Sequence, residues 1–320
     1  MKEFFDESMP EYAILSHTWG GEEVSYRDLL DRHCAKSGYD KIEWCCSVAK
    51  ADSISWAWVD TCCIDQTSSA ELTEAINSMY RWYQGAKVCY VLLSDVPSKP
   101  FTESRWFTRG WTLQELIAPK SIIFFDGNWQ AIGTKNSLRN QITECTKIPL
   151  EVLSGSKSLL DISVAQRMSW ASKRRTSRIE DRAYSLLGIF DIHMPLIYGE
   201  GYKAFTRLQE EIMRVFEDYT IFAWKADLEP GAYGGLLAPS PDAFANSSGV
   251  VSADHLAFRT RTTWTVNNRG IQLELPFMGI GPQKLGLALL NCKDEPLCGQ
   301  QPLRDSPPWF GGCLTSQLRE

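Results

Sequence analysis

Three short segments of this 320-residue chain carry polar side chains at or near their C-terminal ends. These side chains are of types that suit ligand binding or catalysis. The segments are residues 12–19 (YAILSHTW), 56–66 (WAWVDTCCIDQ) and 109–116 (RGWTLQEL). The first two begin as apolar runs and become polar at their C-terminal ends. In an open α/β sheet, ligands bind in the crevice outside the carboxyl ends of the strands. We therefore expect one site to be formed by Ser16, His17, Asp60, Asp65 and Gln66, which Glu115 joins from a helix.

Glu115 is the candidate for chemistry. It follows Trp111 by four residues, so both side chains lie on one face of a helix. A carboxylate beside an indole suits the binding or cleavage of a glycosidic bond, because the indole stacks on a flat ring and the carboxylate stabilises positive charge on the ribose. The alternatives are an exposed pair of Trp111 and Glu115, or an ion pair of Glu115 with Arg109.

His17 and two aspartates are candidate ligand-binding residues. His17 comes directly after a predicted strand and can donate to a ligand phosphate or ribose; the alternative is a hydrogen-bonded structural histidine. Asp60 and Asp65 flank a turn, where two carboxylates suit Mg²⁺ or ribose hydroxyls; alternatively, each caps a turn or helix. A nucleophilic pair of His17 with Cys62 or Cys63 needs a lowered thiol pKa and an orienting partner, and the sequence indicates neither.

The composition indicates a folded protein with an acidic first quarter. Hydrophobic residues make up 44% of the chain, which argues against disorder. The net charge is −6, and residues 1–80 carry 15 acidic and 6 basic side chains. This charge argues against a nucleic-acid groove there. We interpret the basic run at residues 173–175 as a solvated helix end or loop.

The sequence shows neither a secretory signal nor an apolar stretch that approaches the roughly 20 residues of a membrane span. We therefore expect a cytoplasmic protein with reduced thiols. The ten cysteines include two adjacent pairs, Cys45-Cys46 and Cys62-Cys63. Neighbours on a strand point to opposite faces, and zinc-binding spacings are absent. We predict no metal site and mostly buried thiols.

Short apolar runs alternate with helical patterns in the first part of the chain. The clearest helix begins after Ser68 and ends near Gly85, and its apolar residues repeat with helical spacing. This alternation predicts a mostly parallel sheet with flanking helices and right-handed crossovers. The predicted strands are residues 12–15, 56–59, 88–93 and 121–125. The predicted helices are residues 40–51, 71–83 and 111–117.

The middle of the chain is predicted to be helical and the C-terminal part β-rich. The predicted helices are residues 165–170, 179–190 and 203–217, the last with a core-facing stripe of Phe205, Leu208, Ile212, Val215 and Phe216. The later predicted strands are residues 220–224, 263–266, 271–275 and 285–290, with a loop at 239–251. We expect no strong element in the last 25 residues.

Several segments together resemble the fungal heterokaryon-incompatibility (HET) domain family. The resemblance covers about residues 10–215 and includes, besides the three segments above, the run 178–190 (RIEDRAYSLLGIF). It continues through residues 194–201 and 204–212, and Glu74, Met79 and Tyr83 match on the helix after the second segment. Residues 218–241 are similar to a segment that often follows this domain. We therefore expect the HET domain at residues 1–217, with an α/β core at about 10–135 and a helical part at about 136–217, and an incomplete β-rich region at 218–320.

The resemblance implies a role in fungal nonself recognition, in which the domain is the effector that triggers programmed cell death when unlike hyphae fuse. In many relatives it is joined to a NACHT or STAND nucleotide switch and a repeat sensor, and neither is recognisable here. The short lead-in often found upstream is also expected to be missing. HET domains are distantly similar to TIR domains, whose sheet is flavodoxin-like. Some TIR domains hydrolyse NAD⁺ with one glutamate in a W-C-x-x-E-L segment; Trp111 and Glu115 keep this spacing, and Thr112 replaces the cysteine.

Two functional hypotheses follow from the resemblance. In the first, the chain is a cell-death effector with NAD⁺ as substrate and no certain cofactor. Glu115 is then the catalytic residue, and the ligand-binding residues are Ser16, His17, Trp19, Asp60, Asp65, Gln66, Arg109 and Trp111. In the second, the domain is a non-enzymatic adaptor that self-associates or binds other signalling proteins, and the same residues only build the core.

Overall fold

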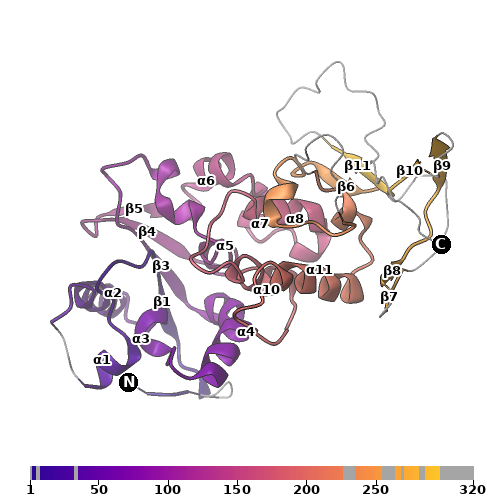
Figure 1. Cartoon of the computed structure of the whole chain (residues 1–320). Coiled ribbons are helices and arrows are strands. Elements are labelled where there is room, and N and C mark those ends of the chain that lie inside the picture. The colour runs from indigo at the N-terminus through magenta and orange to yellow at the C-terminus, as the bar shows by residue number, and fades with distance from the viewer. Residues whose placement is uncertain are drawn as a thin grey trace. The chain divides into compact units, whose positions relative to one another are not determined.

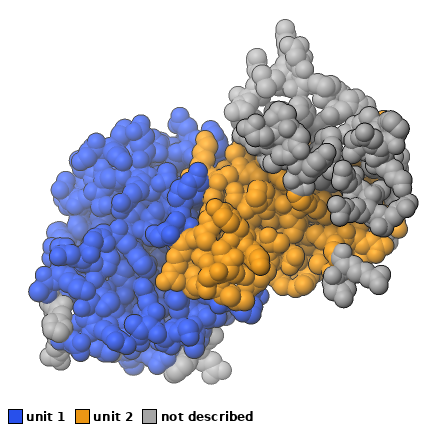
Figure 2. Space-filling model, viewed as in Figure 1, with its two compact units in different colours: residues 1–158, 174–177, 184–196 blue, residues 159–173, 178–183, 197–320 orange. Residues whose placement is uncertain are grey.

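The computed structural model describes residues 2–4, 8–31, 35–225, 235–253, 264–267, 270–280 and 285–295. The chain divides into two compact units, which Figure 2 distinguishes by colour. Unit 1 consists of residues 1–158, 174–177 and 184–196, and unit 2 of residues 159–173, 178–183 and 197–320. Every candidate site residue belongs to unit 1.

Unit 1 is built around a five-stranded sheet with the strand order β2-β1-β3-β4-β5 (Figure 1). The first four strands along the chain are parallel, and β5 pairs with β4 in the antiparallel direction. The predicted mostly parallel α/β sheet is confirmed, whereas the edge strand β5 was not predicted. The strands are β1 (Tyr12–His17), β2 (Trp56–Val59), β3 (Val88–Leu93), β4 (Ile122–Asp126) and β5 (Ala131–Thr134).

Helices connect the strands of unit 1 and flank the sheet (Figure 1). The α-helices are α1 (Tyr26–Leu30), α2 (Tyr39–Ala51), α3 (Asp60–Cys63), α4 (Ser69–Gly85), α5 (Thr112–Ile117), α6 (Arg139–Thr146), α7 (Leu150–Leu153) and α10 (Leu187–Phe190). Two 3₁₀ turns, η2 (Phe101–Glu103) and η3 (Arg105–Thr108), precede α5.

The sheet of unit 1 has a different neighbour on each face. Ala13 and Leu15 of β1 pack in one hydrophobic cluster with Cys45 and Ala49 of α2. Because successive side chains of a strand point to opposite faces, Ser16 lies on the other face. There it contacts Glu115 of α5. Adjacent residues at the end of β1 therefore face different surroundings.

Helix α4 confirms the clearest helix prediction. Ser68 is its N-cap, and the Ser68 hydroxyl accepts a hydrogen bond from the Glu71 N–H at 3.3 Å. The helix ends at Gly85, and the stripe with helical spacing is buried on the inside of unit 1, as shown by Ile76, Met79 and Tyr83.

Unit 2 contains short helices followed by three small antiparallel sheets, which pair β6 with β11, β7 with β8 and β9 with β10. Its helices are η4 (Leu159–Asp161), α8 (Val164–Ala171), α11 (Lys203–Val215), η5 (Tyr219–Phe222) and η6 (Pro241–Phe244), and α9 (Asp181–Tyr184) ends at the unit boundary. Its strands are β6 (Val250–Ser252), β7 (Thr265–Asn267), β8 (Gly270–Gln272), β9 (Phe277–Ile280), β10 (Leu285–Ala288) and β11 (Cys292–Asp294).

Several predictions for the second half differ from the structure. The loop expected at 239–251 contains η6 and the first residues of β6. The single helix expected at residues 179–190 is divided into α9 and α10. Val215, expected in the core stripe of α11, is 61% exposed. The strand expected at 220–224 is the 3₁₀ helix η5, because Asp218 caps the Thr220 N–H at 2.9 Å and the Thr220 hydroxyl accepts from the Ala165 N–H. The last 25 residues lie outside the described residues.

No helix in the described part of the chain combines the length and apolar character needed to cross a membrane.

Candidate functional site

Ser16 and Glu115 meet in the interior of unit 1 although 99 residues separate them in sequence. The Ser16 hydroxyl donates to Glu115 Oε2 at 2.5 Å, and the indole N–H of Trp106 donates to Ser16 Oγ at 2.7 Å. The Tyr83 hydroxyl, from α4, donates to the Leu15 carbonyl at 3.2 Å, and it interacts with the Glu115 carboxyl. We call Ser16, Tyr83, Trp106 and Glu115 the Glu115 cluster; Ser16 is fully buried and Glu115 is 5% exposed.

Burial makes Glu115 a weak acid. Desolvation raises its pKa to about 7, and the nearby charge of Asp60 acts in the same direction. The hydrogen bonds from Ser16 and Tyr83 and the charge of Arg109 oppose this rise. A carboxyl group with a pKa near neutrality can both give and take a proton at physiological pH, which suits acid–base chemistry. Glu115 is therefore not half of an exposed pair with Trp111.

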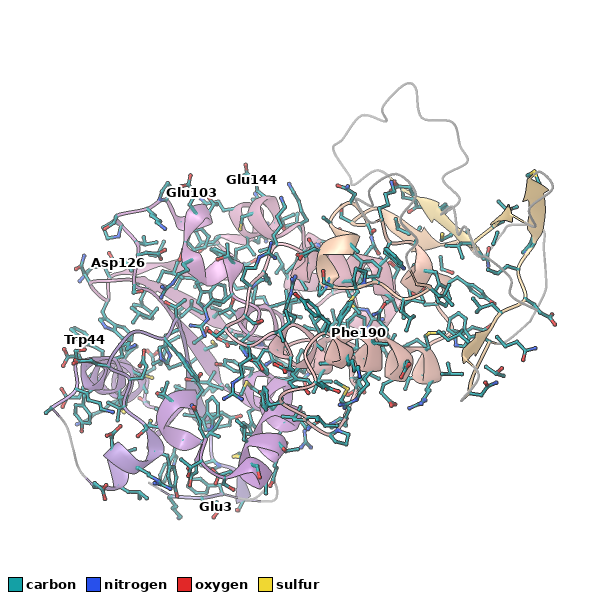
Figure 3. All side chains as sticks on the ribbon, in the orientation of Figure 1. Glu3, Trp44, Glu103, Asp126, Glu144 and Phe190 are labelled. Carbon is teal, nitrogen blue, oxygen red and sulfur yellow. The ribbon has the colours of Figure 1, made fainter. Side chains whose placement is uncertain are left out.

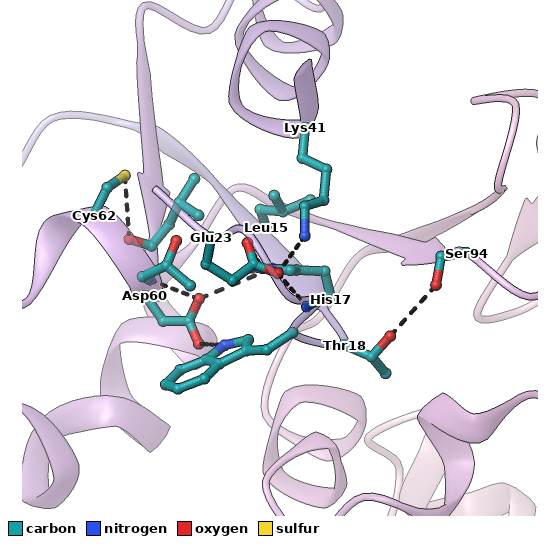
Figure 4. Close-up of polar contacts among 12 residues, drawn as sticks. Leu15, His17, Thr18, Glu23, Lys41, Asp60, Cys62 and Ser94 are labelled. Atoms are coloured by element: carbon teal, nitrogen blue, oxygen red, sulfur yellow. Dashed lines mark hydrogen bonds and ion pairs between the residues drawn. The ribbon is translucent and has the colours of Figure 1, made fainter. Parts of the chain in front are cut away.

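His17 forms a second group on the opposite face of β1 (Figure 4). Its side chain is buried, with Nε2 3.5 Å from Glu23 Oε2 and Nδ1 3.9 Å from Asp60 Oδ1. Lys41 of α2 approaches Glu23 Oε1 at 2.5 Å. Neither ring nitrogen has a hydrogen bond of good geometry among the described residues, so the carboxylates are its nearest polar neighbours. We call His17, Glu23, Lys41 and Asp60 the His17 cluster.

Glu23 is held as a carboxylate. Burial alone would raise its pKa, but the nearby His17 and the hydrogen bonds from Lys41 and the Gly20 N–H outweigh burial and lower the pKa of Glu23 to about 2. A lowered pKa contributes stability above the unfolded value near 4.5, and this contribution is lost as the pH falls through about 2.

Replacing Glu23 with glutamine is expected to lower the free energy of unfolding by about 1–3 kcal/mol at pH 7, because Lys41 and His17 lose their carboxylate partner. The deficit should shrink as the pH falls below about 4.5. Urea unfolding from pH 7 to the lowest pH at which the wild type stays folded measures both values. The exposed Glu22→Gln is the matched control, and a deficit that does not change with pH would contradict the assignment.

Trp19 and Arg109 connect the two clusters at the carboxyl end of β1. The Trp19 indole N–H donates to Asp60 Oδ2 at 2.9 Å, and the Arg109 guanidinium lies 5.8 Å from the Trp19 ring centre. Trp19 is 40% exposed, which leaves part of its ring available to a ligand. Trp111 is half-buried directly before α5. The structure thus brings Ser16, His17, Trp19, Asp60, Arg109 and Glu115 into one region.

Asp65 and Gln66 are placed in a separate turn. Asp65 Oδ1 accepts from the Thr67 N–H at 2.9 Å and from the Thr67 hydroxyl at 2.6 Å, and these bonds lower the pKa of Asp65. Gln66 is exposed. The described contacts join neither residue to the Glu115 or His17 cluster. The same part of the chain shows no group of three or more acidic, histidine or cysteine side chains placed to hold a metal ion.

The contacts described for Cys62 and Cys63 do not include His17, although the hydrogen bond with Cys62 lowers the pKa of Cys63. The hydrogen bond with Cys63, followed by burial, raises the pKa of Cys62 far above its ordinary value. Cys62 Sγ approaches the Val59 carbonyl at 3.8 Å, and the Val59 N–H donates to Cys63 Sγ at 3.4 Å. Both thiols are thus engaged with the backbone before α3.

Two buried cations hold α5, and with it Glu115, at both ends. Arg174 donates to the Arg109 carbonyl and to Thr112 Oγ1, each at 2.9 Å. Lys135 donates to the carbonyls of Ile117 and Pro119. The interpretation of residues 173–175 as solvated is therefore wrong for Arg174, which is 3% exposed because it satisfies these oxygens. Thr112, which stands where the TIR segment has cysteine, forms part of this support.

The important partners that the sequence did not assign to the site are Trp106, Glu23, Lys41 and Arg174. Each contacts a predicted residue from an element far away in sequence or from a loop without a regular pattern. Tyr83 was visible as a core residue of the helix after the second segment, but its polar end was not assigned a partner.

Comparison with known proteins agrees with the resemblance. Residues 12–100 match the family model described as Heterokaryon incompatibility protein (HET), and residues 203–234 match one described as Domain of unknown function (DUF8212). The vegetative incompatibility protein HET-E-1 of Podospora anserina is 54% identical over 220 residues, which cover 64% of this chain and 16% of that protein. No solved structure matches the chain. Residues 12–100 of the chain are therefore similar to the heterokaryon incompatibility family.

Proposed function

We propose that this chain acts in vegetative incompatibility, as a cytoplasmic effector of fungal nonself recognition that triggers programmed cell death. Support comes from the family match at residues 12–100 and from the name of the relative. Because the aligned part is 16% of that relative, the trigger and the remaining activities of the longer protein are not transferred to this chain.

We further propose that the effector cleaves the bond between nicotinamide and ribose in NAD⁺, with Glu115 as the catalytic residue. The observation that carries this proposal is the 2.5 Å contact of Ser16 with Glu115 at the carboxyl end of β1. The strand order β2-β1-β3-β4-β5 places this end beside the switch point between β1 and β3, where flavodoxin-like sheets bind nucleotide ligands.

In this mechanism each side chain has a separate role. Ionised Glu115 stabilises the positive charge that develops on the ribose as nicotinamide leaves. Trp111 stacks on a ring of the substrate, and Ser16, His17 and Asp60 hold ribose or phosphate oxygens. Since Glu115 is 5% exposed, the rim formed by Trp19, Arg109 and Trp111 has to move before substrate reaches it.

Nicotinamide release from NAD⁺ by the concentrated purified chain tests this proposal. Wild type is expected to release nicotinamide, and Glu115→Gln is expected to be slower by about 100-fold or more. Glu144, an exposed residue of α6 labelled in Figure 3, provides the matched control Glu144→Gln, which should match the wild type. A folded wild type without release, or a fully active Glu115→Gln, would exclude this chemistry.

The alternative proposal is a non-enzymatic adaptor, and one observation favours it. Glu115 is enclosed by its own hydrogen-bond partners, whereas several tryptophans are exposed on unit 1, including Trp44 at 47% and Trp19 at 40%. Aromatic residues are enriched in protein interfaces. Self-association by light scattering, together with a failure to bind NAD⁺ in calorimetry, would support the adaptor over the hydrolase.

A further inference from the structure

Trp19 presents its indole at the surface of unit 1 in a fixed orientation. The indole N–H donates to Asp60 Oδ2 at 2.9 Å, so the only polar group of the side chain is already engaged. Trp19 nevertheless remains 40% exposed. An exposed aromatic face that is held in place by its own hydrogen bond is a surface on which a flat ring of a ligand can stack.

Two arginines flank this indole. The guanidinium carbon of Arg109 lies 5.8 Å from the centre of the Trp19 ring, within the range of a cation–π contact. The Arg105 guanidinium donates to the Trp19 carbonyl at 3.4 Å. Arg105 is exposed and Arg109 is half-buried. We call Trp19, Arg105 and Arg109 the arginine–tryptophan platform.

The aspartates nearest to Arg105 are engaged with other donors. Asp60 accepts from the Trp19 indole. Asp95 accepts from the Ser104 hydroxyl at 2.6 Å and from the backbone N–H of Arg105 at 2.8 Å. Among the described residues, the Arg105 guanidinium forms no ion pair with a carboxylate, and its hydrogen bond to a neutral carbonyl leaves its charge uncompensated.

The charge of Arg109 is also not paired within the part of the chain that the structure describes. Glu115 is near enough for this charge to favour its carboxylate form, but the two side chains do not form an ion pair. Two like charges beside one ring repel each other, and an anion bound between them removes that repulsion. The platform therefore favours a ligand that carries both an anionic group and a flat ring.

The platform is connected to the Glu115 cluster through η3. Arg105 and Trp106 are consecutive residues of this short 3₁₀ helix. Arg105 contacts the Trp19 carbonyl, whereas the Trp106 indole donates to Ser16 at 2.7 Å, and Ser16 in turn contacts Glu115. An anion that Arg105 holds would therefore lie on the same part of unit 1 as the candidate catalytic carboxyl group.

We propose that the platform docks the diphosphate group of a nucleotide between Arg105 and Arg109, with one flat ring of that nucleotide stacked on Trp19. The fork of an arginine matches two oxygens of one phosphate, so two arginines suit two neighbouring phosphates. NAD⁺ carries such a diphosphate, and the inference deepens the proposed function and rests on it for the identity of the substrate. Nucleosides without phosphate are expected to bind more weakly.

Isothermal titration calorimetry of the full chain with ADP-ribose tests the platform. ADP-ribose keeps the diphosphate and has no nicotinamide to lose, so its binding is measured without turnover. The wild type is expected to bind it at least about 10-fold more tightly than adenosine, and inorganic pyrophosphate should compete with it. Arg105→Gln and Arg109→Gln are each expected to weaken ADP-ribose binding by about 10-fold, because each loses a charge-assisted hydrogen bond.

The salt dependence of binding separates an electrostatic contact from a displaced loop. The affinity of the wild type for ADP-ribose should fall as sodium chloride rises from about 50 to about 500 mM, and this fall should be smaller in Arg105→Gln and Arg109→Gln. Trp19→Ala should bind more weakly but keep the salt dependence of the wild type, because both guanidinium groups remain. Arginine variants that bind weakly and keep the full salt dependence would overturn the proposal, since a displaced Trp19 alone gives that result.

Two exposed residues of unit 1 outside the platform provide matched controls. Arg139→Gln removes one positive charge from α6, and Trp44→Ala removes from α2 an indole that is 47% exposed. Neither change should alter the affinity for ADP-ribose, and far-ultraviolet circular dichroism verifies that each variant is folded. A folded wild type that does not bind ADP-ribose overturns the proposal. Platform variants that bind as tightly as Arg139→Gln overturn it as well.

The binding result is separable from the proposed hydrolysis. ADP-ribose binding that depends on Arg105 and Arg109, with no nicotinamide release from NAD⁺, would exclude the hydrolase and support the platform as a diphosphate site. Nicotinamide release with the same KM for NAD⁺ in the wild type, Arg105→Gln and Arg109→Gln would support the hydrolase and overturn the platform.

Discussion

Gly188→Ala is expected to lower the free energy of unfolding by about 3 kcal/mol or more, the high end of what overpacking a core costs. A Cβ at this position of α10 would lie 2.2 Å from Cβ and 2.6 Å from Cγ of Tyr80 on α4. Real Cβ atoms do not come this close, and Tyr80 Cβ cannot rotate away because it is bonded to the helix backbone. The two helices would have to separate within unit 1.

Urea unfolding of the wild type, Gly188→Ala and Gly21→Ala measures this effect. Gly21 is the matched control, because a Cβ added there would have no atom within 4 Å and its backbone is not left-handed. Its replacement should change the free energy of unfolding by no more than about 1 kcal/mol. A Gly188→Ala protein as stable as Gly21→Ala would show that the close contact between α4 and α10 is not required.

Glu115→Gln is expected to become more stable relative to the wild type as the pH rises, by about 3 kcal/mol between pH 4 and pH 8. Burial raises the pKa of Glu115 from 4.5 to about 7, so the folded wild type binds more protons than the unfolded chain between these values. The wild type therefore loses stability as the pH rises through this range and reaches a constant lower level above it. Glutamine has no proton to lose and keeps its stability.

Urea unfolding of both proteins at several pH values from 4 to 8 gives this difference directly. The exposed Glu144→Gln should differ from the wild type by a constant amount over the same range. If the difference for Glu115→Gln is equally constant, Glu115 is not a buried acid with a raised pKa. The predicted cost to the wild type is typical of residues kept for function at the expense of stability.

The strands of unit 1 were predictable because apolar runs and helical spacing alternate without a break. All four parallel strands lie within two residues of their predicted positions, since one repeating pattern decides them. Strand β5 (Ala131–Thr134) was missed because it is short and its residues are half-buried or exposed. The prediction of a strand at 220–224 was wrong because Asp218 and Thr220 form side-chain hydrogen bonds with nearby backbone N–H groups. No apolar pattern in the sequence reveals such bonds.

The candidate site was predictable only in part. The rule that ligands bind at the carboxyl ends of parallel strands brought Ser16, His17 and Asp60 to one edge. It does not distinguish the two faces of a strand tip, and here Ser16 and His17 enter different clusters. Asp65 was assigned from its sequence position, but its carboxylate is used by Thr67 two residues later. Glu23 comes from a loop and Trp106 from the short 3₁₀ helix η3, where residue spacing carries no information about distant contacts.

The position of Ser16 and His17 at the end of β1 makes the two clusters more sensitive to the length of this strand than to its amino-acid composition. The strand is paired on both sides, with Ile14 opposite Trp58 of β2 and Cys89 of β3. Inserting or deleting one residue before Ser16 would slip this register and exchange the faces that Ser16 and His17 occupy. Glu115 would then meet an imidazole, and Glu23 and Lys41 would meet a hydroxyl. Substitutions can accumulate one at a time along β1. Inserting or deleting a single residue there would instead disrupt both clusters together.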